Sequence, residues 1–205
     1  MLRPFTGRLV ACILIAALAG CAASEIQQDQ AATGRPPLCH AGRDLGEVVV
    51  YPRTAWRPDQ KEPERRAAIA ASAIGRAFAD VPCGFVAEIH AIDEPRDWHE
   101  SEARRAARGA GTDTIILIQV RELGPHGVLS FPTLVSGSAE VVLHVRAIDV
   151  NADQTLLDIE RRRTVGGAYV VESVDDLEAE MVTALKGLIG GVGETPDPLD
   201  APAPS

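Results

Sequence analysis

The sequence predicts an α/β (α+β) domain in which one mixed β-sheet carries about three helices, with the element order βαβαβββα. Two features of the 205-residue chain lead to this class. Between residues 47 and 120, short apolar runs alternate with stretches whose apolar residues recur at helical spacing, as in strand–helix–strand units. Between residues 138 and 164 the apolar period changes to two on both sides of a turn, which is typical of an antiparallel hairpin.

The first strand and the first helix are predicted at residues 47–51 and 63–79. Three consecutive valines favour a strand, and Pro63 suits the first turn of a helix that must end before Pro82. The apolar side of this helix is rich in alanine, which indicates close packing on the sheet. It consists of Ile69, Ala70, Ala73, Ile74, Ala77 and Phe78.

A second strand, residues 85–92, and a second helix, residues 97–108, follow. Asp97 as N-cap with Glu100 three residues later has the spacing of a capping box. Residues 114–120, Thr-Ile-Ile-Leu-Ile-Gln-Val, predict a strand that is covered on both faces at least over its first half. One side of the second strand is expected to hold Phe85, Ala87, Ile89 and Ala91.

The C-terminal half is predicted to contain a hairpin and a closing helix. Strands at residues 138–149 and 155–164 flank an Asn-Ala-Asp turn. The arginine run 161–163 is interpreted as a solvated strand end in an otherwise acidic protein. The last helix is expected to begin at a Ser173 cap and to stop at Gly190.

The N-terminus carries the most specific motif of the chain. Arg3 and Arg8 precede or flank the start of ten apolar residues, 9–18, a run too short to span a bilayer but typical of a secretory signal. Residues 18–21, Leu-Ala-Gly-Cys, resemble the lipobox of bacterial lipoproteins. This resemblance implies cleavage before Cys21, a diacylglycerol thioether on its sulfur, and an acyl chain such as palmitate on the new N-terminus.

This motif predicts both the segments of the chain and its location in the cell. Residues 1–20 are expected to be the signal peptide, residues 21–37 a lipidated flexible tether, residues 38–190 a single domain, and residues 191–205 a disordered acidic, proline-rich tail. The residue after the cysteine is alanine, at a position where aspartate resembles an inner-membrane retention signal. The resemblance therefore implies the periplasmic face of the outer membrane.

The charge of the chain argues against nucleic acid as a partner. The signal holds two of the 20 basic residues and none of the 29 acidic ones, so the mature chain has a net charge of −11. No second long apolar stretch follows the signal, so the acyl chains on Cys21 are the only membrane attachment that the sequence predicts.

Two of the four cysteines are left for pairing. Cys12 leaves with the signal and Cys21 is lipidated, so Cys39 and Cys83 remain in an oxidising compartment. We expect them to form a disulfide across 43 intervening residues, which stabilises the fold by about 4 kcal/mol on the chain-entropy model. Two buried thiols are one alternative, and a metal pair without CxxC spacing is the other.

The order of elements resembles a small α/β domain of periplasm-facing proteins. Residues 111–117, Gly-Thr-Asp-Thr-Ile-Ile-Leu, are similar to the entry of its central strand, and residues 145–149 with Leu156 and Leu157 are similar to its hairpin. The resemblance covers about residues 45–190. It takes in the N-terminal domain of the Tol–Pal protein TolB, the curli-secretion (CsgG-like) lipoproteins and the lipoprotein activators of peptidoglycan synthases, and it implies a non-catalytic docking or assembly module.

One cluster of side chains supports a competing hypothesis, a metal-dependent enzyme centred on His90 and His99. The chain has no GxSxG, HExxH, P-loop or Rossmann glycine motif. A strand position, a turn and a helix cap account for most of the cluster, so we expect no metal, no cofactor and no catalysis. Its members are His90, Asp93, Glu94, Asp97, His99 and Glu100.

A second group of residues is a candidate partner-binding surface. The stretch 124–137 is predicted to be a long loop or a distorted hairpin, yet large apolar residues lie where polar ones are expected. They either fold over the core or form an extra strand, or they make an exposed patch for a partner. They are Val128, Leu129, Phe131, Leu134 and Val135.

The function expected from the sequence is that of an outer-membrane lipoprotein that binds another envelope protein in transport, secretion or cell-wall assembly. Two alternatives stay open: a lipid- or small-ligand-binding accessory lipoprotein of a transport system, and the metal-dependent enzyme. A cavity lined by Val, Leu and Phe would favour the first alternative, and converging His and carboxylate side chains would favour the second.

Overall fold

The computed structural model describes residues 24–28, 36–40, 42–94, 99–130, 134–168 and 177–190. In this part of the chain one six-stranded sheet, in the order β1-β6-β5-β4-β2-β3, carries three helices, which confirms the predicted fold class. The sheet is mixed, because β2 runs parallel to β3 and β4 whereas β4, β5, β6 and β1 alternate in direction. The strands are β1 (Ser24–Gln28), β2 (Glu47–Thr54), β3 (Phe85–Ile89), β4 (Thr114–Ser130), β5 (Leu134–Asp149) and β6 (Gln154–Ala168), and the helices are α2 (Pro63–Phe78), α3 (Glu100–Ala110) and α4 (Leu177–Ile189).

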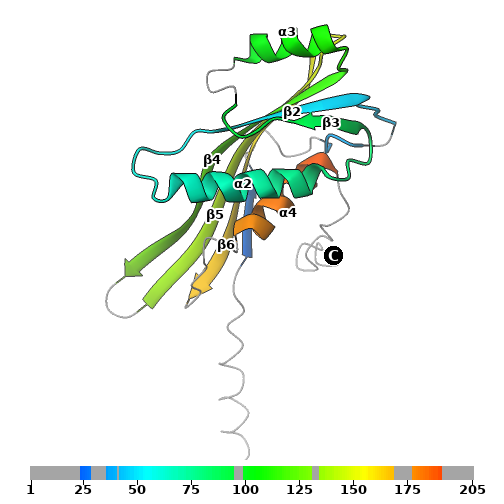
Figure 1. Ribbon diagram of the computed structural model, residues 1–205. Helices are drawn as coiled ribbons and strands as arrows, with labels where there is room; N and C mark the ends of the chain where they lie inside the picture. The colour runs from blue at the N-terminus through cyan, green and yellow to red at the C-terminus, as the bar shows by residue number, and fades with distance from the viewer. Residues whose placement is uncertain are drawn as a thin grey trace, which may run out of the picture.

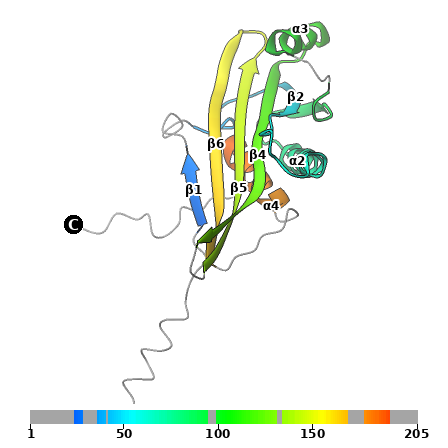
Figure 2. The same ribbon diagram turned by 90° about the vertical axis from the view of Figure 1, so that its left-hand side faces the viewer.

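The helices cover the two faces of the sheet unequally. Helices α2 and α4 lie side by side on one face, and the main core is between them and the sheet (Figure 1). Helix α3 covers only one end of the opposite face, as Figure 2 shows. The first half of β4 is buried from both sides, as predicted: Ile116 and Ile118 pack in the main core, and Ile115 and Leu117 pack under α3. Each such burial contributes about 1.5–3 kcal/mol.

A bulge in β4 keeps Leu123 in the core. Val120 pairs with Leu143 and Glu122 pairs with Val142, so Arg121 is one residue too many for the ladder. Without this extra residue the alternation of the strand would turn Leu123 away from α2 and α4. With it, Leu123 is fully buried.

The N-terminal strand corrects one prediction. Residues 24–28, inside the flexible tether predicted for residues 21–37, form β1 and pair antiparallel with β6, from Ser24 opposite Val165 to Gln28 opposite Arg161. The sequence Ser-Glu-Ile-Gln-Gln has no strong strand propensity. Its pairing depends on backbone hydrogen bonds to an edge that β6 leaves open, and no local pattern predicts that edge.

Strand β3 differs from its prediction, because the residues predicted to share one side are divided. Phe85 is 70% exposed, whereas Ile89 packs against the main core together with Val86. Ala87 is left out of the register with β2, which pairs Val86 with Val48 and Ile89 with Val50. The irregularity lets two residues three positions apart share one face.

Helix α2 begins at Pro63, as predicted, whereas α3 begins and ends later than predicted. Helix α3 has His99 as its N-cap, and the His99 backbone N–H donates to the Glu102 carboxylate over 3.1 Å, so the predicted Asp97–Glu100 capping box is wrong. Asp97 itself lies outside the described residues, as does the predicted Ser173 cap of α4.

Strands β4 and β5 continue as a hairpin through most of the predicted loop 124–137. Val128 is paired with Ser136, Leu129 with Val135, and Ser130 with Leu134, which confirms the interpretation of this stretch as a hairpin rather than an open loop. The arm extends past the ends of α2 and α4 (Figure 1). Residue 131 and the side chains of the predicted apolar patch lie outside the described residues, so its exposure stays a prediction.

Candidate functional site

Cys39 and Cys83 form a disulfide, with their Cα atoms 5.4 Å apart, as the cysteine count predicts. Two backbone hydrogen bonds extend this link to α4: the Leu38 N–H donates to the Leu188 carbonyl over 2.9 Å, and the Cys39 N–H donates to the Ile189 carbonyl over 2.7 Å. These carbonyls belong to the last turn of a helix, where no intrahelical donor is available. The segment that follows Cys39 is therefore fixed to α4 and, through Cys83, to the start of β3.

Gly46 completes this fixed segment. Its φ of +60° lies in the left-handed region, and a Cβ there would collide with the Asp113 carboxylate. The same carboxylate accepts the Glu47 backbone N–H over 3.0 Å, while the Gly46 N–H donates to Asp44 over 2.9 Å. A glycine is thus required where the chain turns into β2 against the start of β4.

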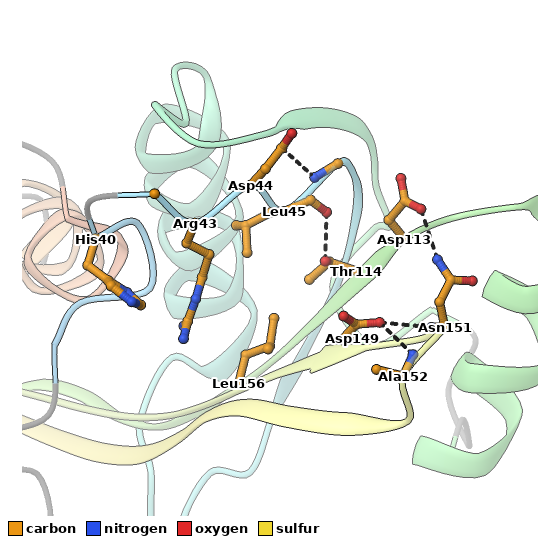
Figure 3. A pocket seen from close by; sticks show the side chains of 12 residues that line it. His40, Arg43, Asp44, Leu45, Asp113, Thr114, Asp149, Asn151, Ala152 and Leu156 are labelled. Atoms are coloured by element: carbon orange, nitrogen blue, oxygen red, sulfur yellow. Dashed lines mark hydrogen bonds between the residues drawn. The ribbon is translucent and has the colours of Figure 1, made fainter.

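A cleft of about 660 Å³ opens between this segment and the β5–β6 turn. His40 and Arg43 lie on one side of it, Asp113, Asp149 and Asn151 lie on the other, and Leu156 lies between them (Figure 3). The first side carries the guanidinium of Arg43 and, next to it, the carboxylate of Asp44, and the second side carries the carboxylates of Asp113 and Asp149. The full lining is His40, Gly42, Arg43, Asp44, Leu45, Gly46, Asp113, Thr114, Asp149, Asn151, Ala152 and Leu156.

Local hydrogen bonds hold the carboxylates of the cleft. Asp149 Oδ1 accepts the backbone N–H groups of Asn151 and Ala152, at 2.9 and 2.8 Å, which is the pattern of an Asx-turn. Asp113 Oδ1 accepts the side-chain amide of Asn151 over 3.0 Å. On the floor, the Thr114 hydroxyl donates to the Leu45 carbonyl over 2.7 Å.

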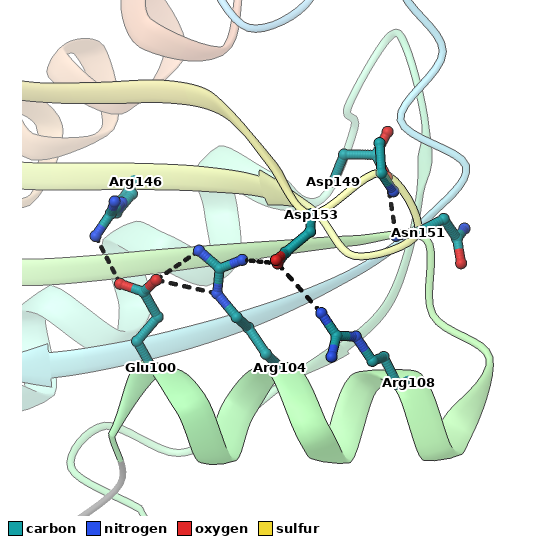
Figure 4. A network of polar contacts seen from close by, with 8 residues as sticks. Glu100, Arg104, Arg108, Arg146, Asp149, Asn151 and Asp153 are labelled. Atoms are coloured by element: carbon teal, nitrogen blue, oxygen red, sulfur yellow. Dashed lines mark hydrogen bonds and ion pairs between the residues drawn. The ribbon is translucent and has the colours of Figure 1, made fainter.

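A network of ion pairs docks α3 onto the sheet next to this cleft. Glu100 forms ion pairs with Arg104 and Arg146, each at 2.6 Å. Asp153 in the β5–β6 turn forms ion pairs with Arg104 and Arg108 (Figure 4). The helix-face arginines of α3 therefore act within the fold. Ion pairs near the surface contribute about 0–1 kcal/mol each, so these partly buried pairs orient α3 more than they stabilise the domain.

The rest of this sheet face is polar and is not covered by a helix in the described part of the chain. A second open cleft, about 510 Å³, lies on it between the residues after β2 and strand β6. Its charges are paired with one another. The pairs are Arg57 with Glu122 at 2.8 Å, Arg162 with Glu140 at 2.6 Å, and Arg121 with Glu160. A sheet with one solvated face needs no further explanation.

The predicted solvated end at residues 161–163 is wrong for its first member. Arg161 is buried, and its Nη1 donates to the Ala184 carbonyl of α4 over 3.1 Å. Arg163 pairs with Glu180 of the same helix at 2.5 Å, whereas Arg162 lies on the opposite, polar face. The run therefore ties β6 to α4.

Three residues of the cluster considered for a metal site have other contacts in the structure. His90 stacks on Tyr51 with ring centroids 4.3 Å apart, and burial, together with the nearby Glu88, raises the pKa of Tyr51. His99 caps α3. Asp93 accepts the backbone N–H and the hydroxyl of Thr54 at 2.7 and 2.6 Å. Within the described ranges no group of three or more His, Cys, Asp or Glu is arranged to hold a metal ion.

Two of the predicted site residues, Cys21 and Phe131, lie outside the described residues. The cleft was missed, because His40 and Arg43 form no motif. Asp113 and Asp149 do stand in the two segments that carry the family resemblance, and their place beside turns was the available indication.

No described helix is both long enough and apolar enough to cross a bilayer. No protein-family model matches the chain, and no curated protein matches it by sequence.

Several solved bacterial proteins are similar to this structure at low identity. The dodecameric PelC of Paraburkholderia phytofirmans has a TM-score of 0.40 and 15% identity over 82% of this chain and 96% of its own. Lipoprotein GNA1162 of Neisseria meningitidis has a TM-score of 0.40 and 14% identity over 71% and 98%. The hypothetical protein CT253 of Chlamydia trachomatis has a TM-score of 0.43 and 14% identity over 70% and 97%. Bacterial lipoproteins are thus among the similar structures.

Proposed function

We propose that the protein is a lipoprotein, anchored through Cys21 to the periplasmic face of the outer membrane, that binds another envelope protein and catalyses no reaction. The observation that carries the binding role is the arm of β4 and β5, whose ladder continues to Ser130 and Leu134, beyond the two helices that cover the sheet. The sequence at its tip is apolar. An apolar protrusion of this kind is typical of a contact surface. We also propose that the domain belongs with the TolB N-terminal, curli-secretion and synthase-activator modules that it resembles.

The base of the arm is held firmly, which suits a contact element. Arg66 of α2 is buried and donates to the Leu123 carbonyl and, over 2.6 Å, to the Lys61 carbonyl. Burial lowers the pKa of this guanidinium. Arg57 pairs with Glu122 on the other face of β4 at 2.8 Å. The strand is therefore fixed from both sides just before the arm begins.

The anchor is tested by metabolic labelling with palmitate and by separation of inner and outer membranes. The wild-type chain should carry label and sediment with the outer membrane. Cys21→Ala should carry none and should leave the membrane fraction. Equal label in both proteins, or wild-type protein in the soluble fraction, would refute the anchor.

The contact is tested by photo-crosslinking in cells, with the reactive amino acid placed at Phe131. The matched control is Ser101, an exposed position on α3. We expect one defined envelope-protein adduct from Phe131 and none from Ser101. In a second experiment, Phe131→Asp should leave the melting temperature nearly unchanged and should abolish recovery of the partner with the protein. A large loss of stability would instead place Phe131 in the core.

A further inference from the structure

We propose that the cleft between residues 40 and 42–46 on one side and the β5–β6 turn on the other binds a small zwitterion, an amino acid or short peptide with free termini. Its carboxylate would lie on Arg43, and its ammonium group would lie on Asp113 and Asp149. This site is separate from the β4–β5 arm, so the proposal does not depend on the partner-binding function proposed above.

One side of the cleft offers a guanidinium that the described part of the chain does not use. Arg43 is half-buried and lies in the cleft, and its side chain makes no hydrogen bond or ion pair with the described part of the chain. An arginine of this kind is suited to bidentate binding of a carboxylate. His40 Nδ1 donates to the Pro37 carbonyl over 3.2 Å, so the neutral ring has only an acceptor left at Nε2, and the carboxylate is assigned to Arg43 alone.

The negative side has acceptor capacity left. Both hydrogen bonds to Asp149 go to Oδ1, and Oδ2 accepts none from the described residues. Each oxygen of Asp113 accepts a single hydrogen bond, which leaves one lone pair on each. An ammonium group brings three donors and a positive charge, which matches these oxygens.

The cleft is held in one shape before any ligand arrives. The disulfide fixes one side of it, and the left-handed Gly46 packs against Asp113 on the other. Its volume of about 660 Å³ lies within the usual range of roughly 300–1,000 Å³ for small-molecule sites. A site that needs no ordering on binding loses less of its interaction energy.

The mixed charge selects among ligand classes. A divalent cation would be repelled by Arg43, and a phosphate would be repelled by Asp44, Asp113 and Asp149. A diamine would leave Arg43 unpaired. A molecule with one charge of each sign satisfies both sides, which is why a zwitterion is favoured.

The test is calorimetric titration of the full mature protein in detergent with glycine, diglycine and triglycine, each with free termini. We expect saturable binding by at least one of the three, which also sets the spacing of the two charges. N-acetylation or C-amidation of that ligand should weaken binding at least tenfold. Equal binding of free and blocked forms, or no saturable binding by any, overturns the proposal.

Variants locate the binding. Arg43→Gln and Asp149→Asn should each weaken it at least tenfold, and the control Arg105→Gln, an exposed α3 position, should not. The amide oxygen that Asp149→Asn introduces can accept the same two N–H groups, so the turn is kept. Calcium, putrescine and phosphate are titrated alongside. Tighter binding of any of these, sensitive to only one of the two variants, overturns the zwitterion assignment.

Discussion

The guanidinium of Arg161 fills the space that a side chain at Gly187 would need. A Cβ built on Gly187 would overlap Nη1 of Arg161, the same nitrogen that donates to the Ala184 carbonyl one turn earlier. Arg161 is only 2% exposed, so it cannot swing out to solvent without uncovering α4. An arginine from the sheet and a glycine from the helix thus form one packing unit.

Gly187→Ala is expected to destabilise the domain by about 1–2 kcal/mol, although alanine is the better helix former. Overpacking of the Arg161 site costs more than the helix propensity gains. The control is Gly75→Ala in α2, where a Cβ meets nothing within 4 Å; it should stabilise by about 0.5–1 kcal/mol. Urea unfolding measures both, and a gain in both would show that Arg161 moves aside without cost.

Removal of the disulfide should be the most destabilising change outside the core. The double variant Cys39→Ser, Cys83→Ser releases a link between residues 44 positions apart, and we expect a loss of about 2–4 kcal/mol. Reductant should lower the urea midpoint of the wild type to that of the variant and leave the variant unchanged. Two titratable thiols in the unreduced folded protein would contradict the disulfide itself.

Asp93 should resist replacement for two separable reasons. Its φ of +59° disfavours residues with a Cβ, although less so aspartate and asparagine, and its carboxylate holds both polar groups of Thr54. Asp93→Ala should cost about 2–3 kcal/mol and Asp93→Asn less than about 1 kcal/mol. Asp93→Gly, which relieves only the backbone, should fall between them in thermal denaturation. An alanine variant as stable as the asparagine variant would contradict both reasons.

Glu178 makes the α2–α4 contact sensitive to acid. Hydrogen bonds from Arg76 and Ser72, at 3.0 and 2.9 Å, hold the pKa of Glu178 below its ordinary value. The ionised Glu178 carboxylate therefore contributes its full stabilisation of the folded state above the unfolded pKa of about 4.3. This stabilisation is lost as the pH falls through the lower pKa of the folded state. The stability difference between wild type and Glu178→Gln should shrink over that acidic range. A difference independent of pH would contradict the assignment.

Periodicity predicted the elements that depend on burial. The run at residues 114–120, the inward series of β5 and the alanine face of α2 all pack in the core where their spacing placed them. These elements are determined by which side chains leave water, and that information is local.

The elements that sequence reasoning missed depend on backbone pairing or on a polar group facing inward. Strand β1 is joined to β6 by backbone ladder hydrogen bonds, which need no particular side-chain pattern. Arg161 was mistaken for a surface residue, although it continues the inward series of Leu157 and Ile159. Alternation was the better guide there than charge.

The cleft could not be predicted because its parts are distant in the chain. His40 follows the disulfide, Asp113 opens the central strand, and Asp149 caps a hairpin turn. Each has an ordinary local role in the sequence. Their proximity follows only from strand order, which places the start of β2 beside the start of β4 and the end of β5.

The strand at Ser24–Gln28 bears on the membrane anchor proposed above. Only residues 22 and 23 separate Cys21 from β1, and three peptide steps reach at most about 10 Å. If Cys21 carries the proposed acyl chains, the β1 edge of the sheet would lie beside the lipid headgroups. The distance of the domain from the bilayer would then be set by the sheet and its hairpin arm, and the proposed partner would have to bind close to the membrane surface.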